Sequence, residues 1–324
     1  MKKSLATLWT LAALVGSLHM GCTKNTTGPD DTAPAGVTDE VSAMKVAAEN
    51  DEFVKNDELS FADQEITATD YVYLSGRIEA SITPIRWGRF INSVTRTVTT
   101  TIQPGDTIAT AHVHKNINGT LKIRAIRGID TVLVEKQFND QSDRNVIFRR
   151  VERSPRYWKN WVPVATSLVD GGTVNGQIDI TMLTVISGTD TIRVTDPQNF
   201  YLRYRWLRQM YGNKDLFNRN RDMMEFTGGG TMTVRVTLQS SSADTDIVAL
   251  RHGFNAQSKN RARMLLVSQT PNAGGYLKVY EKTFVVQNRP GQFHAAVEAM
   301  TKATLYDDTA AYNVSWWGVP YRVF

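Results

Sequence analysis

Two histidines separated by one residue are the first candidates for chemistry in this sequence. His112 and His114 lie in a stretch of alternating polar and apolar residues, so in a β-strand both imidazoles project from the same face. Such a pair supplies two ligands for zinc or copper, which needs at least a third. The other histidines of the body, His252 and His294, have no partner at a ligand spacing. We therefore interpret His112 and His114 as a surface pair and expect no cofactor, with a metal centre as the alternative.

Arginine and aromatic residues are mixed closely in two stretches, 149–161 and 201–208. Exposed together, such side chains stack on sugars or bases and bind phosphates or carboxylates. The alternative, which we favour, is that the tryptophans fill the cores of β-sandwiches while the arginines lie on solvated strand faces, because large aromatic side chains dominate core energetics. If the stretches bind a ligand, the candidate residues are Trp158, Trp161, Arg203, Arg205 and Trp206.

The signatures of common enzyme classes are absent from the sequence. It contains no Gly-x-Ser-x-Gly elbow, no His-Glu-x-x-His, no Walker loop and no Rossmann fingerprint followed by a helix. Paired carboxylates for glycoside hydrolysis come together only in the folded chain, so the sequence does not reveal them. The aspartates at 140–143 and 307–308 lie in turn-like contexts, where Asp commonly fixes a turn. We therefore expect no enzyme activity.

The elements that must position these residues are strands. The 324 residues are 41% hydrophobic and 21% charged, as in ordinary globular proteins, and a net charge of +5 is too small to require nucleic acid as a partner. From Tyr71 onward polar and apolar residues alternate, and Thr, Val and Ile are abundant. Four Asp-containing turn motifs separate strand-like runs, at 105–108, 129–132, 189–192 and 244–247. We expect Asp106, Asp130 and Asp190 to be turn residues.

This pattern predicts an all-β fold with two β-sandwich domains. The first spans 71–198, and the second, immunoglobulin-like, spans 230–324 with six strands at 231–239, 246–252, 261–268, 276–287, 293–304 and 312–323. Residues 199–229 form a connector, within which 200–224 fit a helix or a strand equally well.

The first 22 residues have the three parts of a secretory signal. Lys2 and Lys3 form the positive start, and the charge-free stretch from Leu5 to Leu18 is too short to span a bilayer but suits a signal core. Gly21, a small residue, directly precedes Cys22, the single cysteine of the chain, and the motif Leu-His-Met-Gly-Cys resembles the lipobox of bacterial lipoproteins. That resemblance implies removal of residues 1–21 as a signal peptide and attachment of diacylglycerol and palmitate at Cys22.

Segment 22–70 is expected to be a lipidated, acidic and partly helical tether. Residues 23–36 are small, polar or rich in Pro and Gly and cannot bury enough surface to fold. From Asp39 apolar residues recur at helical intervals, with Thr38 or Asp39 as the N-cap. The acidic run offers calcium binding as an alternative, but the glycine of an EF-hand loop is missing.

Together these features predict a lipid-anchored, non-catalytic protein of the cell envelope with a structural or binding role. Its partners are the membrane, through the lipid anchor, and an envelope glycan or another envelope protein, but no nucleic acid. Thr23 follows Cys22 where Asp is typical of inner-membrane retention, so the resemblance implies the outer membrane. The alternatives are a carbohydrate-binding or glycan-processing surface lipoprotein and a metal-dependent periplasmic protein.

Overall fold

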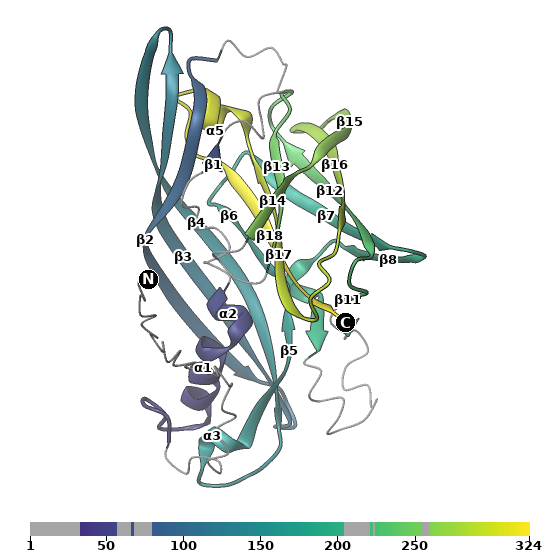
Figure 1. Ribbon diagram of the computed structural model, residues 1–324. Helices are drawn as coiled ribbons and strands as arrows, with labels where there is room; N and C mark the ends of the chain where they lie inside the picture. The colour runs from purple at the N-terminus through teal and green to yellow at the C-terminus, as the bar shows by residue number, and fades with distance from the viewer. Residues whose placement is uncertain (1–32, 57–65, 68–79, 204–220, 223, 254–258) are drawn as a thin grey trace, which may run out of the picture. The chain divides into compact units, whose positions relative to one another are not determined.

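The structure is a computed structural model that describes residues 33–56, 66–67, 80–203, 221–222, 224–253 and 259–324. Residues from Pro34 onward form one compact unit. The predicted all-β class is confirmed, because most of the described chain lies in two largely antiparallel sheets and the helices are few and short (Figure 1). The predicted signal and Cys22 lie outside the described residues.

Sheet A is the larger of the two sheets. Its 13 strands are β1 Ile66–Thr67, β2 Thr83–Ile102, β3 Ile108–Arg127, β4 Asp130–Arg150, β5 Trp161–Ser167, β6 Val169–Thr173, β9 Tyr201–Arg203, β10 Arg221–Asp222, β11 Met224–Phe226, β13 Ile247–Gly253, β14 Lys259–Arg263, β17 Gly291–Met300 and β18 Val314–Val323. Nine of them follow the order β1-β2-β3-β4-β6-β18-β17-β13-β14. At the side of this path, β5 pairs with β4 and β9, β10 with β9, and β11 with β18.

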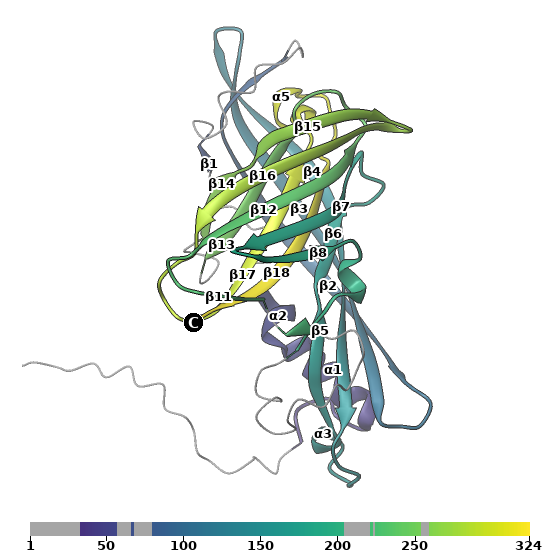
Figure 2. The same cartoon turned by 90° about the vertical axis from the view of Figure 1, so that its right-hand side faces the viewer.

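Sheet B packs on sheet A and completes a sandwich. Its strands are β7 Ile178–Ser187, β8 Asp190–Val194, β12 Thr231–Ser240, β15 Leu265–Asn272 and β16 Gly275–Val285, in the order β15-β16-β12-β7-β8. It covers β13, β17 and β18 (Figure 2), and apolar side chains of both sheets, such as Val236, Leu250 and Val297, are buried between them. Both sheets contain strands from the two segments that we predicted as domains, since β6 pairs with β18 and β7 with β12.

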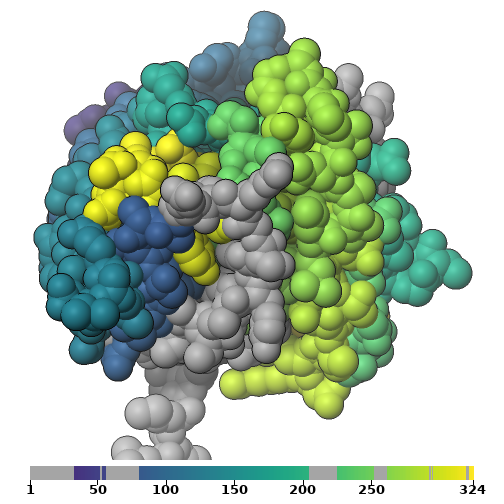
Figure 3. All heavy atoms as spheres, turned by 90° about the horizontal axis from the view of Figure 1, so that it is seen from above, coloured from purple at the N-terminus to yellow at the C-terminus, as the bar shows by residue number. Residues whose placement is uncertain are grey.

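Sheet A also curls, so that β2, β3 and β4 share a second core with β13, β17 and β18. Trp87 and Leu121 from β2 and β3 share this core with Trp316 from β18. Seen from above, yellow atoms near the end of the chain lie between the blue and teal atoms of the long strands and the green atoms of sheet B (Figure 3). Gly171 is required here, because a Cβ at this position would lie 2.4 Å from the Trp316 ring.

The alternation read in the sequence has the expected physical cause in β3. Ala111 and Val113 face the buried side of the sheet, while His112 and His114 lie on the opposite, partly exposed side. Three of the four predicted turns close hairpins, namely β2–β3, β3–β4 and β7–β8. The turn at 244–247 instead connects β12 of sheet B to β13 of sheet A.

The predicted helix is present and packs on sheet A. It is α1, Glu40–Asn50, and Asp39 is its N-cap, with a carboxylate that accepts a hydrogen bond from the Ser42 amide at 2.7 Å. Met44 and Ala48 are buried in a core that they share with residues of β3, β4 and β5. The remaining helices are α2 Glu52–Asn56, α3 Tyr157–Asn160, α5 Lys302–Tyr306 and the 3-10 helix Pro197–Asn199. None of the described helices combines the length and the apolar character that crossing a bilayer requires.

Candidate functional site

An acidic groove opens where the long strands of sheet A extend past sheet B. We use this name for the space of about 380 Å³ lined by β4, β6, β7 and β18 together with the 174–176 turn. Asp143, Asp170 and Asp179 line it from three different strands, with Gln141 and Thr173 beside them. Asp143 and Asp170 are paired across β4 and β6, and opposite residues of paired strands project from the same face. The groove therefore presents mainly hydrogen-bond acceptors.

The two predicted histidines lie beside this groove. Both rings face Asp143 of the neighbouring strand, whose Oδ1 lies 3.0 Å from His112 Nε2 and 2.8 Å from His114 Nδ1. The second ring nitrogen of His112 lies 3.0 Å from Asn145 Oδ1. The shared face predicted for His112 and His114 is thus confirmed, and the pair is tied to the groove through Asp143.

Two carboxylates of the groove, Asp170 and Asp179, bind protons more tightly than an ordinary aspartate. Burial, together with the negative charges of Asp179 and Asp143, raises the pKa of Asp170 to about 6. Burial also raises the pKa of Asp179, against a hydrogen bond from Ser315. At neutral pH Asp170 is therefore close to the range in which a carboxyl group both donates and accepts protons. A carboxyl group with a raised pKa beside further carboxylates is one feature of the sites that hydrolyse glycosides.

The turn-like interpretation of the aspartates at 140–143 is wrong, although that of Asp307 is confirmed. Asp140 and Asp143 lie within β4 and project to opposite faces of sheet A. Asp140 is buried and accepts hydrogen bonds from Thr173 and Tyr312 at 3.0 Å each, and burial raises its pKa to about 6. Asp307 accepts a hydrogen bond from the Thr309 amide, as in an Asx turn.

The described residues contain no group of three or more His, Cys, Asp or Glu side chains placed to hold a metal ion. His112, His114 and Asp143 form hydrogen-bonded contacts in one row along the sheet. His252 and His294 lie on β13 and β17, which pair with each other on the other side of β18 from β3 and β4. The metal alternative therefore has no support from this geometry.

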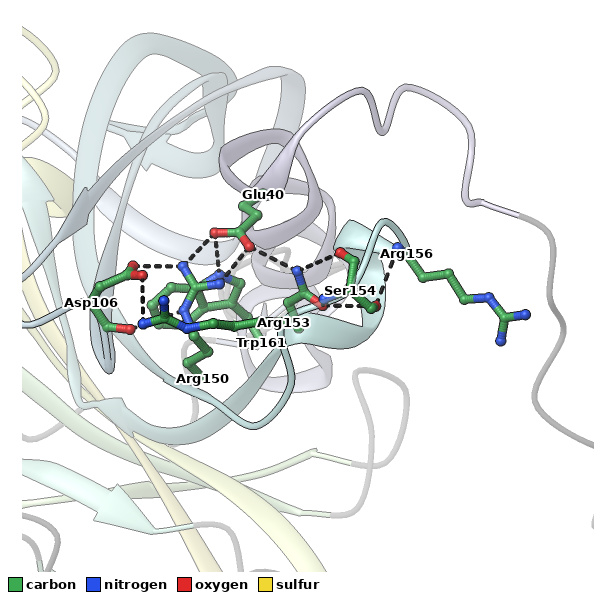
Figure 4. A network of polar contacts seen from close by, with 8 residues as sticks. Glu40, Asp106, Arg150, Arg153, Ser154, Arg156 and Trp161 are labelled. Carbon is green, nitrogen blue, oxygen red and sulfur yellow. Dashed lines mark hydrogen bonds and ion pairs between the residues drawn. The ribbon is translucent and has the colours of Figure 1, made fainter.

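We call the first predicted ligand-binding stretch, residues 149–161, the basic–aromatic segment. The Glu40 carboxylate of α1 accepts hydrogen bonds from this segment (Figure 4). Arg150 donates from both terminal nitrogens to Glu40, at 2.5 and 2.6 Å. Asn160 and the Trp161 indole nitrogen donate to the same carboxylate, at 2.8 and 3.1 Å. Asp106 binds Arg150 from the other side at 2.6 Å, so this turn residue also belongs to the network.

The structure separates the predicted ligand-binding residues. Trp161 is buried, and the Arg150 guanidinium lies 4.5 Å from the centroid of its ring, so Trp161 cannot stack on a ligand. Trp158 is partly buried on α3, and Arg203 is partly buried on β9. Arg205 and Trp206 lie outside the described residues.

The sequence interpretation missed Asp170 and Asp179. Asp179 lies between two isoleucines and has the pattern of an ordinary solvent-facing strand residue. Asp170 precedes two glycines and has the pattern of a turn residue. Only the pairing of β6 with β4 and β18 brings Asp170 to Asp143, and local sequence carries no signal for that pairing.

No protein-family model matches the chain, and no curated protein is similar to it.

Proposed function

We propose that this chain is a lipid-anchored, non-catalytic protein of a bacterial cell envelope whose acidic groove binds a ligand. The signal-like N-terminus and the lipobox resemblance at Cys22 support the anchor and an outer-membrane location. The observation that carries the binding role is the meeting of Asp143, Asp170 and Asp179 in an open groove. Carboxylates attract positive charge and accept hydrogen bonds, so the ligand class is one rich in ammonium or hydroxyl groups, as in the amino sugars of envelope glycans.

The binding role is tested with the purified chain on an array of envelope glycans with free and with acetylated amino groups. We expect selective retention of the glycans with free amino groups. Replacing Asp170 and Asp179 by asparagine keeps the shape of the groove and removes two of its three carboxylates, so retention should fall at least tenfold. The matched control is Glu281→Gln on sheet B, which should bind as the wild type does. Equal retention by the double variant would refute a role for the groove.

The anchor is tested separately by metabolic labelling with palmitate. We expect the wild-type chain to incorporate the label and Cys22→Ala to incorporate none. Label in neither chain, or in both equally, would refute lipidation at Cys22 and would leave the groove hypothesis standing.

A second candidate is glycan processing, which the raised pKa of Asp170 favours. In this role Asp170 is the proton donor to the glycosidic oxygen, and Asp179 or Asp143 is the second carboxylate. The two candidates differ in product. Release of new reducing ends from envelope glycans by the wild type, and not by Asp170→Asn, would support processing, whereas binding without release supports the non-catalytic role.

A further inference from the structure

We propose that the basic–aromatic segment is the surface on which this protein rests on the anionic headgroups of its own membrane. The inference rests on the lipid anchor of the proposed function and adds the contact that orients the folded chain. The partner is a bilayer that contains anionic phospholipid.

The segment lies where the chain from the anchor enters the fold. Ala33, the first described residue, is 11 positions after Cys22, so the intervening chain spans at most about 40 Å when fully extended. Six residues separate Ala33 from Glu40 at the start of α1. Glu40 is bonded to Arg150, Asn160 and Trp161, so the start of α1 and the basic–aromatic segment are held at the same end of the fold.

The chemistry of the segment suits an anionic lipid surface. Residues 149–159 contain five basic residues and one acidic residue. Glu40 pairs with Arg150, and Asp106 pairs with both Arg150 and Arg153. Counting these two carboxylates and Asp39, the N-cap of α1, leaves an excess of one positive charge. Arg156 is exposed and points away from the fold (Figure 4), while Tyr157 and Val151 are exposed apolar or amphipathic side chains. Basic residues with interleaved aromatic side chains are typical of contacts at the headgroup level.

The opposite end of sheet A carries the alternative surface that could contact the membrane. The β3–β4 hairpin ends in Gly128 and Ile129, and the Ile129 side chain is 99% exposed. Asp106 and Gly128 lie at opposite ends of β3, whose 20 residues span about 65 Å. Cys22 lies 18 positions before Glu40, so only an almost fully extended chain, about 65 Å long, would let the membrane reach the Gly128 end. A membrane that holds Cys22 therefore meets the basic–aromatic segment first, and Ile129 serves as the internal control.

The experiment uses the single cysteine of the chain. When Cys22 is acylated, Tyr157→Cys, Val151→Cys and Ile129→Cys each introduce one free thiol for a nitroxide spin label. The acylated full chains are reconstituted into vesicles of three parts phosphatidylethanolamine to one part phosphatidylglycerol, or of phosphatidylcholine alone. The measurement is the collision rate of the nitroxide with a water-soluble nickel chelate. Val151 provides a second position should Tyr157→Cys perturb the fold.

We expect labels at 157 and 151 to become at least tenfold less accessible to nickel in the anionic vesicles only, while the label at 129 stays accessible. Changing Arg153, Arg156 and Lys159 together to glutamine should abolish this protection, because each basic residue near an anionic surface strengthens the contact about fivefold. Protection at 129 instead, equal accessibility at all three positions, or equal protection on phosphatidylcholine would overturn the inference and leave the anchor intact. A wild-type chain that accepts the nitroxide at Cys22 is not acylated, and the lipid anchor and this inference would then both fail, while the groove hypothesis would stand.

Discussion

Replacing Glu40 by glutamine removes the charge at the centre of the α1 network and preserves the shape of the side chain. Arg150, Asn160 and Trp161 donate four hydrogen bonds to this carboxylate, and they join α1 to the end of β4 and the start of β5. Glutamine can accept only part of this set and turns a donor toward Arg150. We therefore expect Glu40→Gln to weaken the docking of α1 on sheet A.

The magnitude follows from the proton affinity of Glu40. The hydrogen bonds from Arg150, followed by those from Asn160 and Trp161, lower its pKa from 4.5 to about 2. That difference corresponds to about 3 kcal/mol in favour of the carboxylate in the folded state. Glu40 remains 22% exposed to screening solvent, and Arg150 keeps Asp106 as a partner. We therefore expect Glu40→Gln to lower the free energy of unfolding by about 2 kcal/mol at pH 7.

Urea denaturation and hydrogen exchange of the α1 amides measure this loss. A loss of about 2 kcal/mol corresponds to about thirtyfold faster exchange if α1 opens locally. Because the folded pKa lies below the unfolded one, the contribution is complete above about pH 5 and decreases as the pH falls toward 2, so the difference between the two chains should shrink by more than half at about pH 3.

The control for this experiment is Glu281→Gln. Glu281 forms an exposed pair with Arg235 on sheet B, and its replacement should cost less than about 1 kcal/mol. An unchanged urea midpoint for Glu40→Gln at pH 7, or a loss that is the same at both pH values, would refute the role assigned to this carboxylate.

Three further predictions concern the acidic groove and the two cores. Asp170→Asn should stabilise the chain by about 1 kcal/mol at pH 8 and leave its stability unchanged near pH 4, because the pKa of Asp170 in the folded chain is raised to about 6 and stability is lost as the pH rises through that value. Thermal unfolding at both pH values measures the difference, and equal shifts in melting temperature at pH 4 and pH 8 would contradict the prediction. Asp246→Ala leaves the buried Lys278 without its carboxylate partner, which lies 2.7 Å away, so urea denaturation should show a free energy of unfolding lower by about 3–5 kcal/mol. A decrease below about 1 kcal/mol would show that this buried ion pair does not stabilise the fold. Gly171→Ala places a methyl group 2.4 Å from the Trp316 ring and should lower the melting temperature more than Gly128→Ala does, because Gly128 has a φ of +61° but open space around the position of a Cβ. A larger decrease for Gly128→Ala would show that the packing around Trp316 adapts to the added methyl group.

The strands themselves were predictable from the sequence, because alternation is a local property. On one face of the long strand β3 the residues from Ala109 to Ala125 are apolar or glycine except for the buried Lys115, and the turn at Gly128 allows a two-residue hairpin. The helix start at Asp39 was also predictable, since its capping box depends only on Ser42, three residues away.

Strand partners were not predictable in the same way. The run predicted at 261–268 contains Met264, at which the chain leaves β14 in sheet A and begins β15 in sheet B. Both halves alternate and are rich in strand-forming residues, so no local feature shows that they belong to different sheets. For the same reason the sequence could indicate His112 and His114 as a pair but could not place Asp170 and Asp179 beside them.

The position of β18 has a consequence for how the chain folds. This strand is the last in chain order, yet its neighbours β6 and β17 lie on both sides of it in sheet A. While a nascent chain lacks residues 314–323, β6 and β17 expose unpaired edges and the Trp87 core lacks Trp316. Pairing of β6 with β18 joins residues about 140 positions apart, which makes folding slow by the contact-order relation. A holding chaperone that shields strand edges until residues 314–323 have been made would therefore raise the yield of the native protein more than one that accelerates local turns.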